Sequence, residues 1–239
     1  MARNMEIPTP VDTVEYAPVR AVDAVVERMR VLDASLRPRD GVAVFNRVYL
    51  TVTSEFAGLL GGGRFPDRGS AATLGVLFAE RYLAVAEADR RGGRLPACWR
   101  PLFRLRGHPG VRPVQFALAG INAHIGHDLV LAVVDSCRAI GCGPADLEDE
   151  FERVGDILAS LEERVREELM PGPDLFQVAD PLTHLAGAWS LDRARDTTWS
   201  MARALWALRR MPELASDFTG RLDAAVGVVG RMLLTPLDR

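Results

Sequence analysis

The fold of this chain is decided by an apolar stretch at residues 115–134, which reads QFALAGINAHIGHDLVLAVV. A helix that is apolar around most of its circumference is typical of the centre of a protein, where other helices surround it. Asn122, His124, His127 and Asp128 lie in the middle of this stretch. Burying such groups is costly unless hydrogen bonds, a metal ion or a shifted pKa compensates. The stretch therefore predicts both the central helix and the position of a functional site.

Helical periodicity continues on both sides of this stretch. Apolar residues recur at spacings of three and four, Gly and Pro clusters separate the segments, and we find no segment with the alternation of a strand. We expect helices at about 14–35, 41–60, 70–91, 112–140, 144–170 and 212–234, and two shorter ones that begin near 180 and 190. Asp40 is the expected N-cap of the second helix.

This pattern predicts an all-α fold. We expect a single multi-helix, bundle-like domain over residues 14–239, built around a buried central helix from about Arg112 to Ile140. A flexible N-terminal arm is expected over residues 1–13. A chain of 239 residues with 48% hydrophobic and 26% charged residues suits one domain with an extended core.

Charge and composition narrow the range of partners. The formal net charge is −3 and arginines are scattered among acidic residues, so nucleic acid is not an expected partner. We recognise no signal peptide, and polar residues interrupt every long apolar run, so we expect a cytoplasmic protein without a membrane partner. The three cysteines have no zinc-finger spacing and are expected to be reduced. A homodimer is compatible with the apolar outer faces, although no heptad run predicts a coiled coil.

The polar residues of the central helix are expected to share a face. Steps of 100° per residue place His124, Asp128 and Asp135 in one sector, with His127 at its border. Asn122 points nearly the opposite way, so we expect it to hydrogen-bond a neighbouring helix or loop. His124 and Asp128 are the candidate catalytic pair.

Other residues have a supporting role in this hypothesis. Arg81 lies on the apolar face of the third helix, where it either extends its guanidinium to water or forms an internal ion pair. Gly120 and Gly126 lower helix propensity, so we expect another element to pack closely against them. The candidate supporting residues are Asn122, His127, Arg81 and Asp135.

One hypothesis is a divalent metal site. His124 and Asp128 are four residues apart, and His184 and Asp180 repeat that spacing in a later helix. Imidazole and carboxylate ligands from facing helices suit Zn, Fe or Mn. Such an ion supports a hydrolase, a lyase or an oxygenase. Asp180 precedes a proline and also fits an N-cap.

Two alternatives require no metal. In one, Asp128 orients His124 as a general base. In the other, the buried groups form a polar network that only fixes helix packing. The expected function is an enzyme acting on a small, largely apolar molecule, and the alternative is a non-catalytic small-molecule-binding or assembly protein. Trp189, Trp199 and Trp206 fit either the lining of an apolar pocket or the core. No Walker or dinucleotide-binding sequence is present, so we expect no nucleotide or flavin cofactor.

The segment Gly120–Leu129, GINAHIGHDL, resembles the signature of a bacterial family of unknown function, domain-of-unknown-function family 5995. That signature is approximately Gly-(Ile/Met)-Asn-Ala-His-Ile-x-x-Asp-Leu. The resemblance implies that Asn122, His124 and Asp128 belong to the family pattern. It also implies that the position of His127 is variable. His127 and Asp128 also match the His-Asp doublet of the HD-type metal phosphohydrolases. In that class the histidine of the doublet is required, which differs from the variable position in the family signature.

Overall fold

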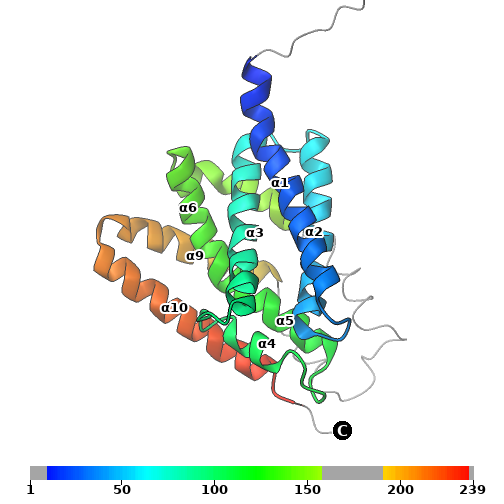
Figure 1. The fold of residues 1–239 in the computed structure, drawn as a ribbon. Coiled ribbons are helices and arrows are strands. Elements are labelled where there is room, and N and C mark those ends of the chain that lie inside the picture. The colour runs from blue at the N-terminus through cyan, green and yellow to red at the C-terminus, as the bar shows by residue number, and fades with distance from the viewer. Residues whose placement is uncertain (1–9, 158–190, 237–239) are drawn as a thin grey trace, which may run out of the picture.

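The computed structural model describes residues 10–157 and 191–236 (Figure 1). Its longer helices are α1 (Pro10–Ser35), α2 (Gly41–Gly61), α3 (Arg68–Arg90), α5 (Pro113–Ala123), α6 (Val130–Ile140), α9 (Leu191–Ala207) and α10 (Pro212–Leu233). Shorter pieces are α4 (Arg100–Leu105), the π-helical turn η1 (His124–Leu129) and the 3-10 turns η2 (Pro144–Leu147) and η4 (Leu208–Arg210). Residues 148–157 are also helical. No β-strand occurs in these two ranges, and the all-α prediction is confirmed.

The central helix runs without a break through α5, η1 and α6, from Pro113 to Ile140 (Figure 1). This agrees with the predicted range of about Arg112 to Ile140. By length and composition it is apolar enough to cross a membrane, but 78% of its most apolar window is buried among the other helices. That burial is the arrangement of a core helix.

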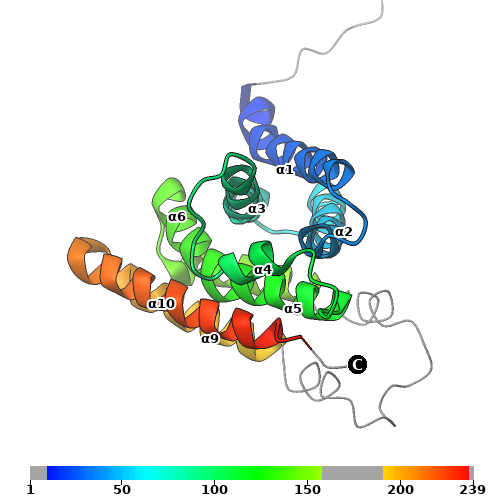
Figure 2. The same cartoon turned by 60° about the horizontal axis from the view of Figure 1, so that its bottom comes forward.

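The remaining helices form two groups around this central helix (Figure 2). On one side, α1 packs against α2 and α3, and these two contact α5 and α6 respectively. On the other side, α9 contacts α6, and α10 contacts α5. The short helix α4 touches α2, α5 and α10. The polar residues of the central helix are therefore enclosed from both sides.

Local signals explain most of the helix ends. The Asp40 side chain accepts a hydrogen bond from the Val42 N–H at 2.8 Å, which confirms the predicted N-cap of α2. α1 begins at Pro10, four residues before the predicted start, so its first turn lies in the stretch expected to be an arm. We predicted no helix in the aromatic connector after α3. The structure has α4 there, with Pro101 in its first turn, where the missing N–H of proline costs nothing.

Two glycines let neighbours approach the central helix, as predicted. A Cβ atom built on Gly120 would overlap the Phe45 ring of α2. One built on Gly126 would lie 3.2 Å from a methyl group of Val226 on α10. The central helix is therefore packed closely on both sides at the level of the polar residues.

Gly120→Ala is expected to destabilise the protein by about 1–3 kcal/mol, because the added methyl group must displace Phe45 from a packed core. Gly58→Ala is the matched control, since it adds a methyl group to helix α2 with no neighbouring atom within 4 Å. It is expected to be neutral or slightly stabilising, as Ala favours a helix over Gly. Urea unfolding of both variants measures the difference. Equal stability of the two would show that Phe45 yields without cost.

Candidate functional site

Asp128 is the centre of the buried polar cluster in η1. Its Oδ2 accepts a hydrogen bond from the Trp99 indole N–H at 2.9 Å and lies 3.1 Å from His124 Nδ1. Its Oδ1 lies 2.8 Å from His127 Nδ1. An ionised carboxylate only accepts hydrogen bonds, so both imidazoles donate from Nδ1, and Nε2 is the acceptor in the neutral form of each ring. Asp128 thus sets the tautomer of two histidines.

The protonation states follow from burial and from these hydrogen bonds. Burial raises the pKa of Asp128, but the hydrogen bonds from His124 and His127, together with the positive charge that each ring carries when protonated, outweigh it and lower the pKa overall. Burial lowers the pKa of His124, and the opposing effect of Asp128 does not restore it. At neutral pH, Asp128 is therefore ionised and His124 is neutral.

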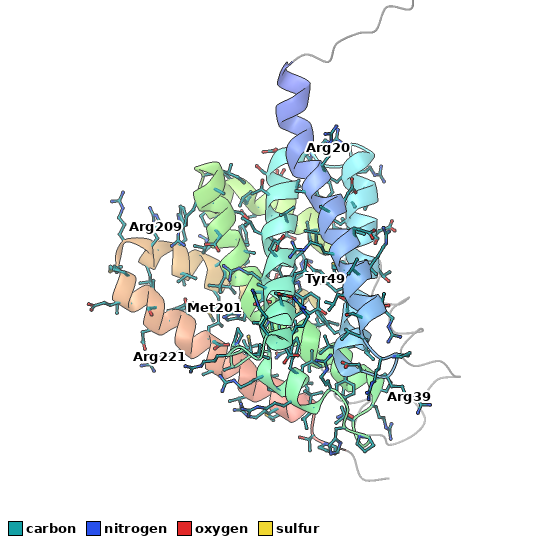
Figure 3. The ribbon with its side chains drawn as sticks, in the orientation of Figure 1. Arg20, Arg39, Tyr49, Met201, Arg209 and Arg221 are labelled. Atoms are coloured by element: carbon teal, nitrogen blue, oxygen red, sulfur yellow. The ribbon has the colours of Figure 1, made fainter. Side chains whose placement is uncertain are left out.

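The His124 ring lies in an aromatic enclosure between α2 and α3. It stacks on Phe78 with a centroid distance of 3.7 Å, and Tyr49 meets it edge-on at 4.3 Å. Tyr49, which is labelled in Figure 3, is itself buried, at 8% exposure. Phe45, Tyr82 and Trp99 complete the enclosure. His124 is only 3% exposed, and its Nε2 has no hydrogen-bond partner in the described part of the chain. Because a buried acceptor without a partner is costly, it is a candidate functional atom.

Asn122 points away from this cluster, as predicted. Its Nδ2 donates to the Val226 carbonyl oxygen of α10 at 3.0 Å. Gln115, on the same face, donates to the carbonyl oxygen of Leu233 at 2.9 Å. The two amides therefore attach α10 to the central helix.

Asp135 is not part of the Asp128 cluster. It forms ion pairs with Arg81 of α3 and with Arg138 of α6, the latter at 3.2 Å. Of the two options for Arg81, the structure shows the ion pair, but both side chains of that pair stay partly exposed, at 28% and 37%. Partly exposed pairs of this kind contribute little to stability. Asp180, His184 and Trp189 lie outside the described residues.

A cavity of about 350 Å³ lies on the other side of η1, against α9 and α10. Its lining is mainly apolar and includes Ile125, Gly126, Thr198, Met201, Leu222 and Val226. The Thr198 hydroxyl donates to the Ile125 carbonyl oxygen at 2.9 Å, which joins α9 to the π-helical turn. Met201 is labelled on α9 in Figure 3.

The tryptophans of α9 belong to the core. Trp199 packs on Phe151 with a centroid distance of 4.6 Å and donates to Glu148 at 3.0 Å. Trp206 is partly buried against the same core. Sequence reasoning missed a different tryptophan, Trp99, which supplies the third hydrogen bond to Asp128. Trp99 lies in a connector 29 residues before Asp128, where no periodicity relates the two positions.

The chain matches a family of unknown function (DUF5995) over residues 22–236. It belongs to this family. The matched range includes every described helix of the fold, from the second half of α1 to α10. No match was found among curated proteins or among solved structures. The family brings no known reaction, so a function must be inferred from the site itself.

Proposed function

We propose that this chain is an enzyme acting on a small, largely apolar molecule, with Asp128 and its two imidazoles as the acid–base group. The observation that carries the proposal is the arrangement around Asp128. One buried carboxylate fixes His124 and His127 through Nδ1 and leaves both Nε2 atoms as bases. An imidazole held in one tautomer by a carboxylate is a common general base.

Two further features support an active site here. The polar residues lie in a π-helical turn, a distortion that is frequent at functional sites. The adjoining cavity has the size and the mainly apolar lining of a small-molecule site. Its lining residues Leu222 and Val226 also fit the expectation of an apolar ligand.

The geometry favours the metal-free pair over a metal ion held jointly by His124 and Asp128. His124 Nδ1 and Asp128 Oδ2 hydrogen-bond each other directly. The same oxygen also accepts the Trp99 N–H, and the other faces His127. Oδ2, the oxygen nearest His124, thus already accepts two N–H donors. A metal bound by this pair would have to displace hydrogen bonds that hold the buried carboxylate.

A structural polar network is the second candidate. It is favoured by the near-complete burial of His124, whose ring is covered by Phe78 and Tyr49. None of His124, His127 and Asp128 is among the residues that line the cavity. In this alternative, the cluster only locks α2, α3 and the central helix together, and the cavity binds its ligand without turnover.

Binding in the cavity is tested with a panel of small apolar probes: a medium-chain fatty acid, a monoterpene alcohol and an aromatic ester. Ala194→Phe fills the cavity and is expected to weaken binding at least about tenfold, a loss of about 1.4 kcal/mol. Ala204→Phe, an exposed position on the same helix, is the matched control and is expected to bind as the wild type does. Failure of every probe to bind would contradict the cavity as a ligand site.

Catalysis is tested with the probe that binds best. Asp128→Asn removes the charge that fixes both histidines, so turnover per folded molecule is expected to fall by a factor of about 10² to 10⁴. Probe affinity is expected to change little, since Asp128 does not line the cavity. Unchanged turnover in Asp128→Asn would contradict the acid–base role and favour the structural network.

A further inference from the structure

His127 belongs to a second cluster, formed where η1, α10 and the connector before α4 meet. Cys98, His127 and Asp223 each bring one ligand-type atom into a group whose members lie within 4.8 Å of one another. Cys98 comes from the connector before α4, His127 from η1 and Asp223 from α10. Three segments far apart in the sequence thus place a thiol, an imidazole and a carboxylate at one point. Cys98 and His127 are buried there, at 1% and 6% exposure.

The carboxylate is held in place by the backbone. Asp223 Oδ1 accepts the Cys98 N–H and Oδ2 accepts the Ala97 N–H, each at 2.9 Å. These bonds leave further lone pairs on both oxygens. Gly227, one turn later on α10, makes the close approach possible. A Cβ atom there would lie 2.5 Å from the Ala97 carbonyl oxygen. The connector and α10 are therefore fitted to each other at this point.

Asp128 orients the His127 imidazole by accepting a hydrogen bond from it. His127 Nδ1 is 2.8 Å from Asp128 Oδ1, so Nε2 is the ring nitrogen left for another partner. Carboxylates that hold a histidine in this way are the usual outer partners of metal-binding histidines. Asp128 is itself fixed by Trp99 and His124. The ligand geometry of His127 is therefore set by a chain of buried hydrogen bonds.

We propose that Cys98, His127 and Asp223 bind one divalent zinc ion. Zinc takes thiolate, imidazole and carboxylate ligands in tetrahedral sites, and three protein ligands leave the fourth position for water. The ion's two positive charges balance the Cys98 thiolate and the Asp223 carboxylate, so the loaded site adds no net charge to a largely buried region. The site includes neither His124 nor Asp128. A bound ion occupies His127 Nε2 and leaves His124 as the base of the proposed acid–base group, and the test below does not use turnover.

Binding has a defined proton balance. A free cysteine thiol has a pKa of about 8.5, so at neutral pH the Cys98 thiol carries its proton until the ion binds. A zinc–sulfur bond forms as the sulfur–hydrogen bond breaks, and the proton leaves to the solvent. Zinc binding is therefore expected to release about one proton per ion and to weaken as the pH falls.

The experiment uses the full chain, stripped with a chelator, dialysed against zinc chloride and measured by elemental analysis and calorimetry. We expect about one equivalent of zinc in the wild type. Affinity is expected to fall at least about 100-fold in Cys98→Ser and in Asp223→Asn, because each loses a ligand. Cys142→Ser and Asp217→Asn are matched controls outside the cluster and are expected to keep the ion. Cobalt serves as a spectroscopic probe. The wild type is expected to show a thiolate-to-cobalt charge-transfer band, which Cys98→Ser lacks.

Three results would overturn the proposal. One is a folded wild-type chain that takes up no stoichiometric zinc. A second is zinc that Cys98→Ser and Asp223→Asn retain with wild-type affinity, which would place the ion elsewhere. The third is a cobalt spectrum without a thiolate band. If Cys98→Ser does not fold, the cobalt spectrum of the wild type and the zinc affinity of Asp223→Asn still test the proposal. None of these readouts uses turnover, so they are independent of the test of the acid–base group.

Discussion

Asp128→Ala is expected to destabilise the protein by about 3–5 kcal/mol, the cost of removing one member of a buried charged network. The substitution leaves the Trp99 indole N–H without an acceptor, and it removes the partner of both imidazoles. Each buried donor left unsatisfied costs about 1–3 kcal/mol, and costs within one network do not add fully. Against a total stability of about 5–15 kcal/mol, this is a large loss.

Denaturant unfolding of the metal-free protein at pH 7 measures this loss, with Asp135→Ala as the matched control on the same helix. Asp135 is one-third exposed and pairs with Arg81 and Arg138, so its removal is expected to cost less than about 1 kcal/mol. Asp128→Asn, which keeps one oxygen acceptor, is expected to lie between the two. A cost of Asp128→Ala as small as that of Asp135→Ala would mean that the cluster relaxes or hydrates without penalty.

The sequence alone was sufficient to predict the helices that carry the site. A long apolar stretch located the central helix, and the low helix propensity of Gly120 predicted close packing there, which the structure shows to be against Phe45. The opposite orientation of Asn122 was also predictable, because a single helical turn decides it. These properties are local, because each depends on residues that are close together in the sequence.

The π-helical turn could not be predicted in this way. A π turn holds more residues than an α turn, so the helix beyond it is rotated relative to a regular α-helix. Asp135 follows η1 and pairs with Arg81, outside the cluster that regular 100° steps predicted for it. The propensities of residues 124–129 do not distinguish the two kinds of turn. The Thr198 hydroxyl of α9 donates a hydrogen bond to the Ile125 carbonyl oxygen in η1, but Thr198 is 73 residues away in the sequence. Local sequence therefore does not show this contact.

The residues that other segments contribute to the site could not be predicted from the sequence either. Trp99 and Asp223 meet η1 only because α4 and α10 fold back onto the central helix. A single residue in a connector or on an amphipathic helix produces no periodic sequence pattern that would predict its contact with η1. The close approach of α10 to residues 97 and 98 depends on Gly227, which in the sequence is one small residue among several on its helix. Tertiary packing, rather than local pattern, therefore determines the second half of the site.

Acid is expected to destabilise the protein in two steps, of which His124 causes the first. Burial lowers the pKa of folded His124, whereas the unfolded histidine has a pKa near 6.5. Below about pH 6.5 the unfolded chain therefore binds a proton that the folded chain does not. Stability then falls with pH, by about 1.4 kcal/mol for each unit between the two pKa values. Asp128 has a lowered pKa, so its contribution persists above about pH 4 and is lost at lower pH, which gives the second step.

Urea unfolding in chelator at a series of pH values from 7.5 to 3.5 measures the first step and the onset of the second. His124→Gln cannot take up a proton in this range, so its stability is expected to lack the slope that begins near pH 6.5. His108→Asn, a change in an exposed loop, is the control and is expected to keep that slope. Among the residues that the structure describes, Asp128 is the one charged group that faces the His124 ring, and it favours protonation. The slope therefore measures how far burial among Phe78 and Tyr49 outweighs an adjacent carboxylate. If wild type and His124→Gln lose stability in parallel between pH 6.5 and 5, the ring accepts a proton when folded, and a neutral Nε2 base inside the aromatic enclosure is wrong.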